Sequence, residues 1–242
     1  DSLEGTGRPT APSYVVAHDK RTGKLLWKVM RMTGADAESC DSYTTPVLSR
    51  SSGRSQMIVM GGNVVDAYDP ANGARLWELP GLVGGRTITG PTVADGLVYV
   101  TTGMRGPLEA VKIGGKGKLA PASAVAWKVK DSTPDTCCPV VAGGFVFLLS
   151  DNGIGTCLDA RTGSRKWRNR LFPRGNCKAS PLAADGHVYF LGYHGQCIVV
   201  DASDNLRIIA TNSLDDAFTA SPAVSNGRIY LRGRKALYAI GK

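Results

Sequence analysis

The side chains best suited to chemistry in this sequence are six cysteines and the imidazole of His194. The cysteines are Cys40, Cys137, Cys138, Cys157, Cys177 and Cys197. Thiolates beside an imidazole can bind zinc or copper, and an even number of cysteines permits disulfides. No CxxC pair, CxxCH haem motif, nucleophile elbow, phosphate loop or HExxH motif occurs. The sequence therefore contains candidate ligands but predicts no catalytic residue.

The formal net charge of the chain is +9, and the basic residues are unevenly distributed. Residues 161–174, "RTGSRKWRNRLFPR", contain six basic side chains and no acidic one, and Arg228, Arg232, Arg234 and Lys235 cluster near the end. Such a surface could bind nucleic acid, anionic lipid or an acidic partner, or could be a solvated edge strand whose charges discourage pairing. We favour the edge strand. We predict no nucleic-acid binding, because no aromatic-rich basic groove for stacking bases is visible.

The composition is that of a globular protein, with 43% hydrophobic and 20% charged residues. No apolar run approaches the roughly 20 residues that a membrane helix needs. The first residues, "DSLEGTGRPTAPS", are polar and are no signal peptide. We therefore expect membrane association only through a partner or through an anchor absent from this sequence.

A repeated unit runs through the chain. Five short strands begin with a small or hydroxyl residue before proline, in "TTPVL", "GPTV", "CCPVV", "ASPLA" and "ASPAV", and their prolines are 41 to 48 residues apart. Four of them lead into a tight turn and a β-rich run, as in "ADGLVYV" and "SNGRIYL". Asp-Gly, Gly-Gly and Asn-Gly supply the positive φ angles that a two-residue hairpin turn requires. Four short antiparallel strands every ~40–45 residues are the signature of a propeller blade.

In three repeats the third and fourth strands are joined by an Asp-x-x-x-Gly turn, and the fourth strand contains a tryptophan. In "DKRTGKLLW", "DPANGARLW" and "DARTGSRKW" the Trp follows the Asp by eight residues. These are Trp27, Trp77 and Trp167, and Trp127 ends the apolar run "SAVAW". In "DASDNLRII" the residue eight after the Asp is Ile209, which keeps the position apolar and favours packing over chemistry.

The predicted fold class is all-β, a β-propeller of four-stranded antiparallel blades. We place a partial blade at 13–30, blades at about 43–79, 90–130, 136–171 and 178–214, and a second partial blade at 219–242. These form one domain over 1–242 or the C-terminal portion of one. The strands number twenty-one, whereas a ring of four-stranded blades needs a multiple of four. We therefore expect about five blades' worth of a larger propeller of about seven or eight blades. The alternative is a closed five-bladed ring from which residues 1–17 peel away.

The repeat resembles the quinoprotein-like (PQQ-type) β-propeller family, in "VVAHDKRTGKLLW", "VVDAYDPANGARLW" and "GTCLDARTGSRKW". The resemblance covers nearly the whole chain. It implies that one residue of each outer strand docks against the neighbouring blade. These residues are Trp27, Trp77, Trp127 and Trp167, and Ile209 takes the place of the Trp in the last full repeat. The family has a branch of quinone-dependent dehydrogenases with calcium and a catalytic Asp. Its other branch contains non-catalytic lipoproteins of outer-membrane assembly and uncharacterised secreted proteins, and the repeats alone do not separate the two.

In a propeller, the loops before the inner strands and the turns between second and third strands share one face, and binding residues gather on such loops. We expect Cys40, Arg86, Cys137, Cys138, Cys177 and His194 on that face. Candidate metal ligands are Cys138, Cys177 and His194, and candidate cofactor-binding residues are Arg86, Cys137 and Cys138. The alternatives are plain thiols, a Cys138–Cys177 bridge between blades, or a vicinal Cys137–Cys138 ring.

The motif "TCCP" (136–139) is similar to the vicinal cysteine pair near the quinone in the dehydrogenase branch, but we find no accompanying acidic and Asn residues in an arrangement that matches that branch. Asp151 and Asn152 fit a hairpin turn better than a calcium site. We therefore predict no cofactor, neither quinone nor calcium.

The favoured function is a non-catalytic binding or scaffolding module outside the cytoplasm, periplasmic or otherwise extracytoplasmic in a bacterium. Its partner would be another protein or further N-terminal blades. The alternative is a fragment of a PQQ-dependent dehydrogenase whose cofactor residues lie partly in missing blades. An extracytoplasmic location implies that some cysteines of the loop-bearing face are oxidised.

Overall fold

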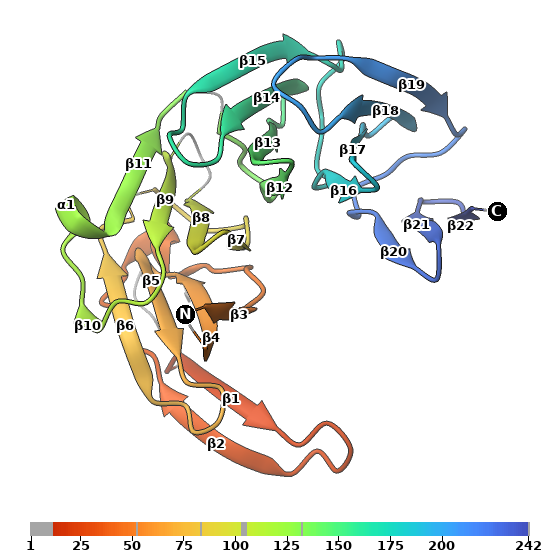
Figure 1. Ribbon diagram of the computed structural model, residues 1–242. Coiled ribbons are helices and arrows are strands. Elements are labelled where there is room, and N and C mark those ends of the chain that lie inside the picture. Colours follow the sequence, from red (N-terminus) through yellow and green to blue (C-terminus); the bar gives the residue numbers. More distant parts are fainter. Residues whose placement is uncertain (1–11, 52, 83, 103–105, 132, 242) are drawn as a thin grey trace. The chain divides into compact units, whose positions relative to one another are not determined.

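The computed structural model describes residues 12–51, 53–82, 84–102, 106–131 and 133–241, and it consists almost entirely of antiparallel sheets (Figure 1). The chain divides into two compact units, Asp1–Lys128 and Val129–Lys242, called the first and second unit below. The boundary falls inside strand β11 (Val125–Val129). No helix within the described residues is long and apolar enough to cross a membrane.

The described residues of the first unit form three sheets. The first sheet is β1 (Tyr14–His18) and β2 (Leu25–Met30), and the second is β3 (Val47–Ser51), β4 (Arg54–Gly61), β5 (Val64–Tyr68) and β6 (Arg75–Pro80). The third sheet is β7 (Thr92–Ala94), β8 (Leu97–Thr101), β9 (Leu108–Lys112) and β11. Two short helices, η1 (Ala37–Cys40) and α1 (Pro121–Ala124), lie in connections.

The second unit also contains three sheets. They are β12 (Val140–Ala142), β13 (Phe145–Leu149), β14 (Ile154–Asp159) and β15 (Arg165–Arg170), then β16 (Leu182–Ala184), β17 (His187–Leu191), β18 (Gln196–Asp201) and β19 (Ile208–Ser213), and finally β20 (Ala223–Ser225), β21 (Arg228–Arg232) and β22 (Leu237–Ile240). Each of these sheets is a meander in which consecutive strands pair, in agreement with the predicted fold class of antiparallel propeller blades.

The first strand pair bears on the five-bladed alternative. In that alternative, residues 14–17 would not pair with any strand. In the structure β1 pairs with β2, from Tyr14↔Met30 to His18↔Leu25. The alternative is therefore wrong on this point. The larger ring of about seven or eight blades stays a prediction.

One strand was not anticipated. Strand β10 (Gly117–Lys118) lies in the connection between β9 and β11, yet it pairs in parallel with Trp77 and Glu78 of β6 in the preceding blade. This repeat has a longer connection in place of the Asp-x-x-x-Gly turn, and the extra length reaches back to the neighbouring sheet (Figure 1).

The hairpin turns follow from residue chemistry. The predicted two-residue turns have both residues at positive φ, as in Asp185 (51°) with Gly186 (73°) and Asn226 (49°) with Gly227 (72°). Glycine, Asn and Asp tolerate this region best, so these dipeptides determine where each first and second strand meet.

The Asp-x-x-x-Gly turns are closed by hydrogen bonds of their own. Asp159 Oδ1 accepts bonds from the amides of Arg161 (3.1 Å) and Thr162 (3.0 Å), and Asp19 does the same for the corresponding residues of its turn. The bond from the Thr162 hydroxyl is the main cause that lowers the pKa of Asp159, followed by the Thr162 amide, and the amide and hydroxyl of Thr22 lower the pKa of Asp19. The Gly of each turn donates back to the Asp carbonyl and has φ near 70°, for example Gly23 (71°).

The predicted docking role of the outer-strand Trp is confirmed at Trp27. Its Nε1 donates to the carbonyl of Pro70, in the Asp-x-x-x-Gly turn of the next sheet, at 3.0 Å. A Cβ on Gly73 of that turn would lie 2.6 Å from Trp27 Cε3, so the turn glycine also makes room for the indole. Trp77 and Trp167 are buried in clusters that combine two successive blades, whereas for Trp127, buried against Tyr99 of its own sheet, docking stays a prediction.

The prediction for Ile209 is wrong, because the turn before it is one residue longer than the others. Asp159 N bonds to the carbonyl of Ser164, but Asp201 N bonds to that of Arg207. The residue facing Val199, in the place where Trp167 faces Cys157, is consequently Ala210. Ile209 lies at the bulge and is 42% exposed.

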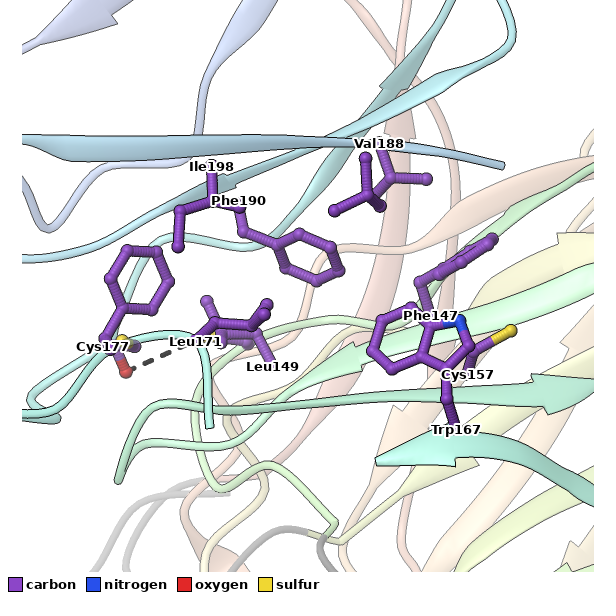
Figure 2. Packing of buried hydrophobic residues seen from close by; sticks show 12 residues of the cluster. Phe147, Leu149, Cys157, Trp167, Leu171, Cys177, Val188, Phe190 and Ile198 are labelled. Atoms are coloured by element: carbon purple, nitrogen blue, oxygen red, sulfur yellow. Dashed lines mark hydrogen bonds between the residues drawn. The ribbon is translucent and has the colours of Figure 1, made fainter. Parts of the chain in front are cut away.

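The core of the second unit lies between its first two sheets. Figure 2 shows Phe147, Leu149 and Trp167 from one sheet and Val188, Phe190 and Ile198 from the next, gathered around the same space. The first unit has a matching cluster between the β3–β6 and β7–β11 sheets, which includes Ile58, Trp77, Leu79, Val98 and Val111. Both clusters hold successive blades together by burying apolar surface.

Candidate functional site

The loop face of the second unit is formed by residues 133–139, 150–153, 171–181 and 192–196. Asp151, in the β13–β14 turn, connects three of these segments. Its carboxylate accepts bonds from the amides of Asp135 (3.1 Å) and Thr136 (3.2 Å) and lies 2.5 Å from Lys178 Nζ. Its carbonyl accepts the amide of Cys177 at 2.9 Å. The predicted sharing of one face by these loops and this turn is confirmed here.

Serines before the inner-strand prolines link successive blades. The amide of Cys138 donates to Ser180 Oγ at 2.9 Å, and the amide of Ser180 donates to Ser221 Oγ at 3.0 Å. This explains why a hydroxyl residue precedes these prolines. The backbone of the loop face is thereby held rigid, which suits a surface that recognises a partner without rearranging.

The cysteines of this face are not arranged for thiolate chemistry. Cys137 and Cys177 are fully buried, and Cys137 Sγ lies 3.2 Å from the carbonyl of Ala179. Burial is the main cause that raises the pKa of the Cys177 thiol to about 11 and also raises that of Cys137. Both groups are therefore neutral near pH 7 and poor ligands or nucleophiles.

The structure joins none of the six cysteines by a disulfide, so neither predicted bridge is formed. Cys137 points into the core while Cys138 is only half-buried, which separates the two thiols of the vicinal pair. Cys157 and Cys197 lie in third strands, and burial raises the pKa of Cys197 to about 11.

The loop before β16 contributes to two hollows on the loop face, and His194 lines the smaller one. One, of about 230 Å³, is lined by Phe172, Pro173, Arg174, Gly175, Gly192, Tyr193, His194 and Gln196, and the other, of about 470 Å³, by Asp151, Asn152, Arg170, Pro173, Arg174, Gly175 and Asn176. Arg174 is exposed and lines both. His194 stacks edge-on against Tyr193, with ring centroids 5.1 Å apart.

Sequence reasoning did not single out Arg174 as a binding residue. It noted only the basic stretch 161–174. The available signal was "PRGN", because Gly175 (φ 60°) and Asn176 (φ 58°) bend the loop so that Arg174 stands out from it. Two successive residues at positive φ mark an exposed, shaped loop.

In the first unit, Arg86 and Cys40 also lie on loops before inner strands. Arg86 Nη1 is 4.0 Å from Glu38 Oε2, in the helix η1 that contains Cys40. Cys40 is buried, and desolvation raises the pKa of its thiol. Arg86 thus has an acidic neighbour from the adjacent loop.

The residues do not fit a calcium–quinone site. Calcium takes 6–8 oxygen ligands, and the Asp151 carboxylate is already engaged by two amides and Lys178. Within the described part of the chain, no three His, Cys, Asp or Glu side chains are gathered in a way that could hold a metal ion. Cys138, Cys177 and His194 therefore do not form a three-ligand site.

Two curated relatives are outer membrane protein assembly factors. The chain is 27% identical over 186 residues to "Outer membrane protein assembly factor BamB" of Moranella endobia, covering 69% of this chain and 43% of that protein. It is 26% identical over 236 residues to the protein of the same description from Yersinia pestis, covering 90% of this chain and 56% of that protein. The chain spans about half the length of the curated relatives it matches.

Solved structures agree with the fold. The crystal structure of BamB from Moraxella catarrhalis superposes with a TM-score of 0.64 at 16% identity, covering 94% of this chain and 64% of that one. The computationally designed Ika8 protein superposes with a TM-score of 0.64 at 12% identity, covering 90% and 63%. The family model described as "Outer membrane protein assembly factor BamB" matches residues 11–119 and 117–208. The chain therefore belongs to that family, the outer-membrane-assembly branch of the PQQ-like repeat proteins.

Proposed function

We propose that this protein is a non-catalytic, extracytoplasmic binding module that takes part in outer membrane protein assembly by holding a protein partner. The observation that carries the proposal is the match of the assembly-factor family over most of the chain. We infer a periplasmic location from the same match, with membrane association through a partner or an anchor outside this sequence.

The chemistry of the described residues supports binding over catalysis. The buried thiols are neutral near pH 7, and the Asp151 carboxylate serves to connect loops. The dehydrogenase alternative gains no support, since the relatives named above are assembly factors and Asp151 does not fit a calcium ligand.

We propose the loop face of the second unit as the surface that meets the partner. Arg174 on this face and Arg170 at its border give it positive charge, and Tyr193 and His194 add rings beside a hollow. Aromatic and Arg side chains dominate the energetics of protein interfaces, and a rigid backbone beneath them reduces the entropy lost on binding. The partner surface is expected to be acidic.

Site-specific photo-crosslinking tests this proposal. A photoreactive amino acid at Arg174 or His194 is expected to crosslink, in the periplasm of the native bacterium, to a component of outer membrane protein assembly. The matched control is the same amino acid at Asp204, an exposed turn residue of the same unit outside the loop face. Arg174→Glu should reduce the crosslink from position 194.

Two results would overturn the proposal. Equal crosslinking of the same partner from position 204 would remove the loop face as the binding surface. Capture only of proteins unrelated to the outer membrane, with unchanged levels of outer membrane proteins when the gene is deleted, would remove the assembly role.

A further inference from the structure

One backbone position recurs at four joints between blades. The residue that follows the outer strand donates its amide to the carbonyl of the residue just before the third strand of its own sheet: Arg31 to Ser13 (2.8 Å), Gly81 to Asn63 (3.1 Å), Leu171 to Gly153 (2.9 Å) and Leu214 to Gly195 (3.1 Å). Because the bond and its place in the strand ladder are the same, these four residues are structurally equivalent, and we call this the joint position.

At three joints the side chain of this residue packs toward the next blade. Arg31 reaches the third strand of the next sheet, where its Nε lies 3.1 Å from Asp66 Oδ1 and its Nη2 2.9 Å from the carbonyl of Gly61. Leu171 belongs to the same buried cluster as Ile198, and Leu214 packs against the cluster of Leu231. An ion pair or apolar contact therefore closes each of these joints.

The joint between the β3–β6 and β7–β11 sheets is closed by the residue after the joint position, Leu82, which lies in the buried cluster between the two sheets. The joint position itself is different. It is Gly81, which has no side chain, and a Cβ built there would meet no atom within 4 Å. The φ of Gly81 is 96°, a conformation that residues with a side chain rarely adopt. A larger residue at this position would therefore strain the backbone. A cavity of about 290 Å³ remains, lined by Leu79, Pro80, Gly81, Glu109, Pro121, Ala122, Val125 and Lys128.

A carboxylate lies in this cavity where Asp66 lies at the preceding joint. Glu109 faces Val100 in its ladder as Asp66 faces Val59, so the two acids are equivalent. The side chain of Glu109 is only 7% exposed, and Lys128 Nζ lies 2.5 Å from its Oε1. The Lys128 side chain is 40% exposed and comes from the neighbouring strand of the same sheet.

We propose that this cavity binds an arginine side chain of another protein, in the place that Arg31 occupies at the preceding joint. The volume is below that of drug-sized pockets and suits a single side chain. Leu79, Pro80, Pro121 and Val125 provide apolar walls for the methylene stem, and Glu109 provides a carboxylate for the guanidinium.

The guanidinium would displace Lys128 from Glu109. A guanidinium is more weakly hydrated than an ammonium and presents a planar fork that matches a carboxylate, so it is better suited to a buried partner. Lys128 is exposed enough to turn into water when it is displaced. The partner arginine and Glu109 would then form an ion pair of the same kind as Arg31 and Asp66 at the preceding joint. This site uses no residue of the loop face and does not depend on the proposed function.

The test uses a blocked arginine as the probe. N-acetyl-arginine methylamide is titrated into the 242-residue protein while backbone amide signals are recorded by NMR. Saturable shifts are expected at Gly81, Val125 and Lys128 and not at Asp66, where Arg31 already fills the equivalent place. The citrulline analogue, which has the same shape without the charge, should bind about tenfold or more weakly. Equal binding of both probes, or no saturable shift at these residues, would overturn the proposal.

Three variants sharpen the test. Glu109→Gln should weaken arginine binding about tenfold or more, because a charge-assisted bond is lost. If that variant unfolds, Ala122→Phe keeps the carboxylate and blocks the cavity from an exposed position, and it should abolish the shifts. Lys128→Met removes the competing ammonium and should tighten binding. Weaker binding by Lys128→Met, or unchanged binding by either of the other variants, would contradict the proposed site.

Discussion

The joint after β2 and the joint after β15 share a backbone plan and are filled with opposite chemistry. At the first, Arg31 and Asp66 form a buried ion pair, with the Tyr68 hydroxyl donating to Asp66 Oδ2 at 2.7 Å. At the second, the equivalent places hold Leu171 and Ile198, within a cluster of aromatic and aliphatic side chains. Each blade presents the same hydrogen bonds, but the side chains between blades differ.

This difference shows that the repeat specifies the backbone of each joint but not the side chains that pack there. Those side chains can be polar or apolar, provided that the two facing blades contribute side chains of the same kind. The polar joint is the more vulnerable of the two. Desolvation raises the pKa of Asp66, and Arg31 opposes that rise. A buried ion pair adds little net stability over an apolar pair, whereas removing one partner is costly.

The largest effect is expected from Arg31→Met. It leaves the Asp66 carboxylate buried without its cation and should lower the free energy of unfolding by about 3–5 kcal/mol at neutral pH. Urea denaturation followed by tryptophan fluorescence measures it. Arg31→Met combined with Asp66→Asn should recover most of the loss. A double variant as unstable as the single one would contradict the charge explanation.

The same variant should be pH-dependent. Without Arg31 the folded pKa of Asp66 rises further above its unfolded value of about 3.9. Between those two values the native state binds more protons than the unfolded state, so stability falls as pH increases through this window. The loss caused by Arg31→Met is therefore expected to be smaller near pH 4.5 than at pH 7, and denaturation curves at both pH values check this.

The apolar joint is tested by Trp167→Ala. The indole is 8% exposed in the cluster between two blades, and truncation should cost at least about 3 kcal/mol. A melting midpoint equal to that of the unmodified protein would show that Trp167 does not dock the blades.

Replacing tryptophan by phenylalanine separates the two joints further. Trp27→Phe loses the bond to Pro70 and should cost about 1 kcal/mol. Trp167 Nε1 is buried without a hydrogen-bond partner, so Trp167→Phe should cost less than Trp27→Phe, despite the greater burial of Trp167. The reverse order would mean that Trp167 has a partner such as an ordered water.

The smallest effect is expected from Ile209→Ser. Ile209 is exposed at the bulge, so this variant should stay within about 0.5 kcal/mol of the unmodified protein. Ile198→Ala, in the buried cluster of the same sheet, is the matched control and should cost about 2–5 kcal/mol. A large loss for Ile209→Ser would restore the docking role first predicted for it.

The blades could be predicted because their signals are local. Asp-Gly and Asn-Gly turns, prolines at the inner strands and the Asp-x-x-x-Gly turns act within a few residues of themselves. Ile209 was wrongly assigned to the docking position because we assumed that this position always follows the Asp by eight residues. The Asp201 turn contains one residue more than the others. Strand β10 was missed because its partner, β6, is about 40 residues away and belongs to another blade.

The functional surfaces were harder to predict for the same reason. Arg31 and Asp66 are 35 residues apart, and no local pattern joins them. The thiol candidates were placed correctly before the inner strands, but sequence could not show that Cys137 and Cys177 turn into the core. The cavity at Gly81 was recognised by comparing the four joint positions, and that comparison requires the hydrogen bonds between strands to be known.

The β-bulges keep the same place in the strand ladder even where the turn before the fourth strand changes length. In four third-to-fourth strand ladders the shift falls at the same place, at Ala17/His18, Ala67/Tyr68, Cys157/Leu158 and Val199/Val200. A slip of one residue would turn every following side chain to the wrong side of the sheet. The extra residue after Asp201 causes no such slip, because the turn absorbs it and Ala210 still faces Val199. An insertion at these turns is therefore confined to one hairpin. A duplicated blade would bring its own turn and bulge with it, so the number of blades could change in evolution without changes to the sequence pattern of the other blades.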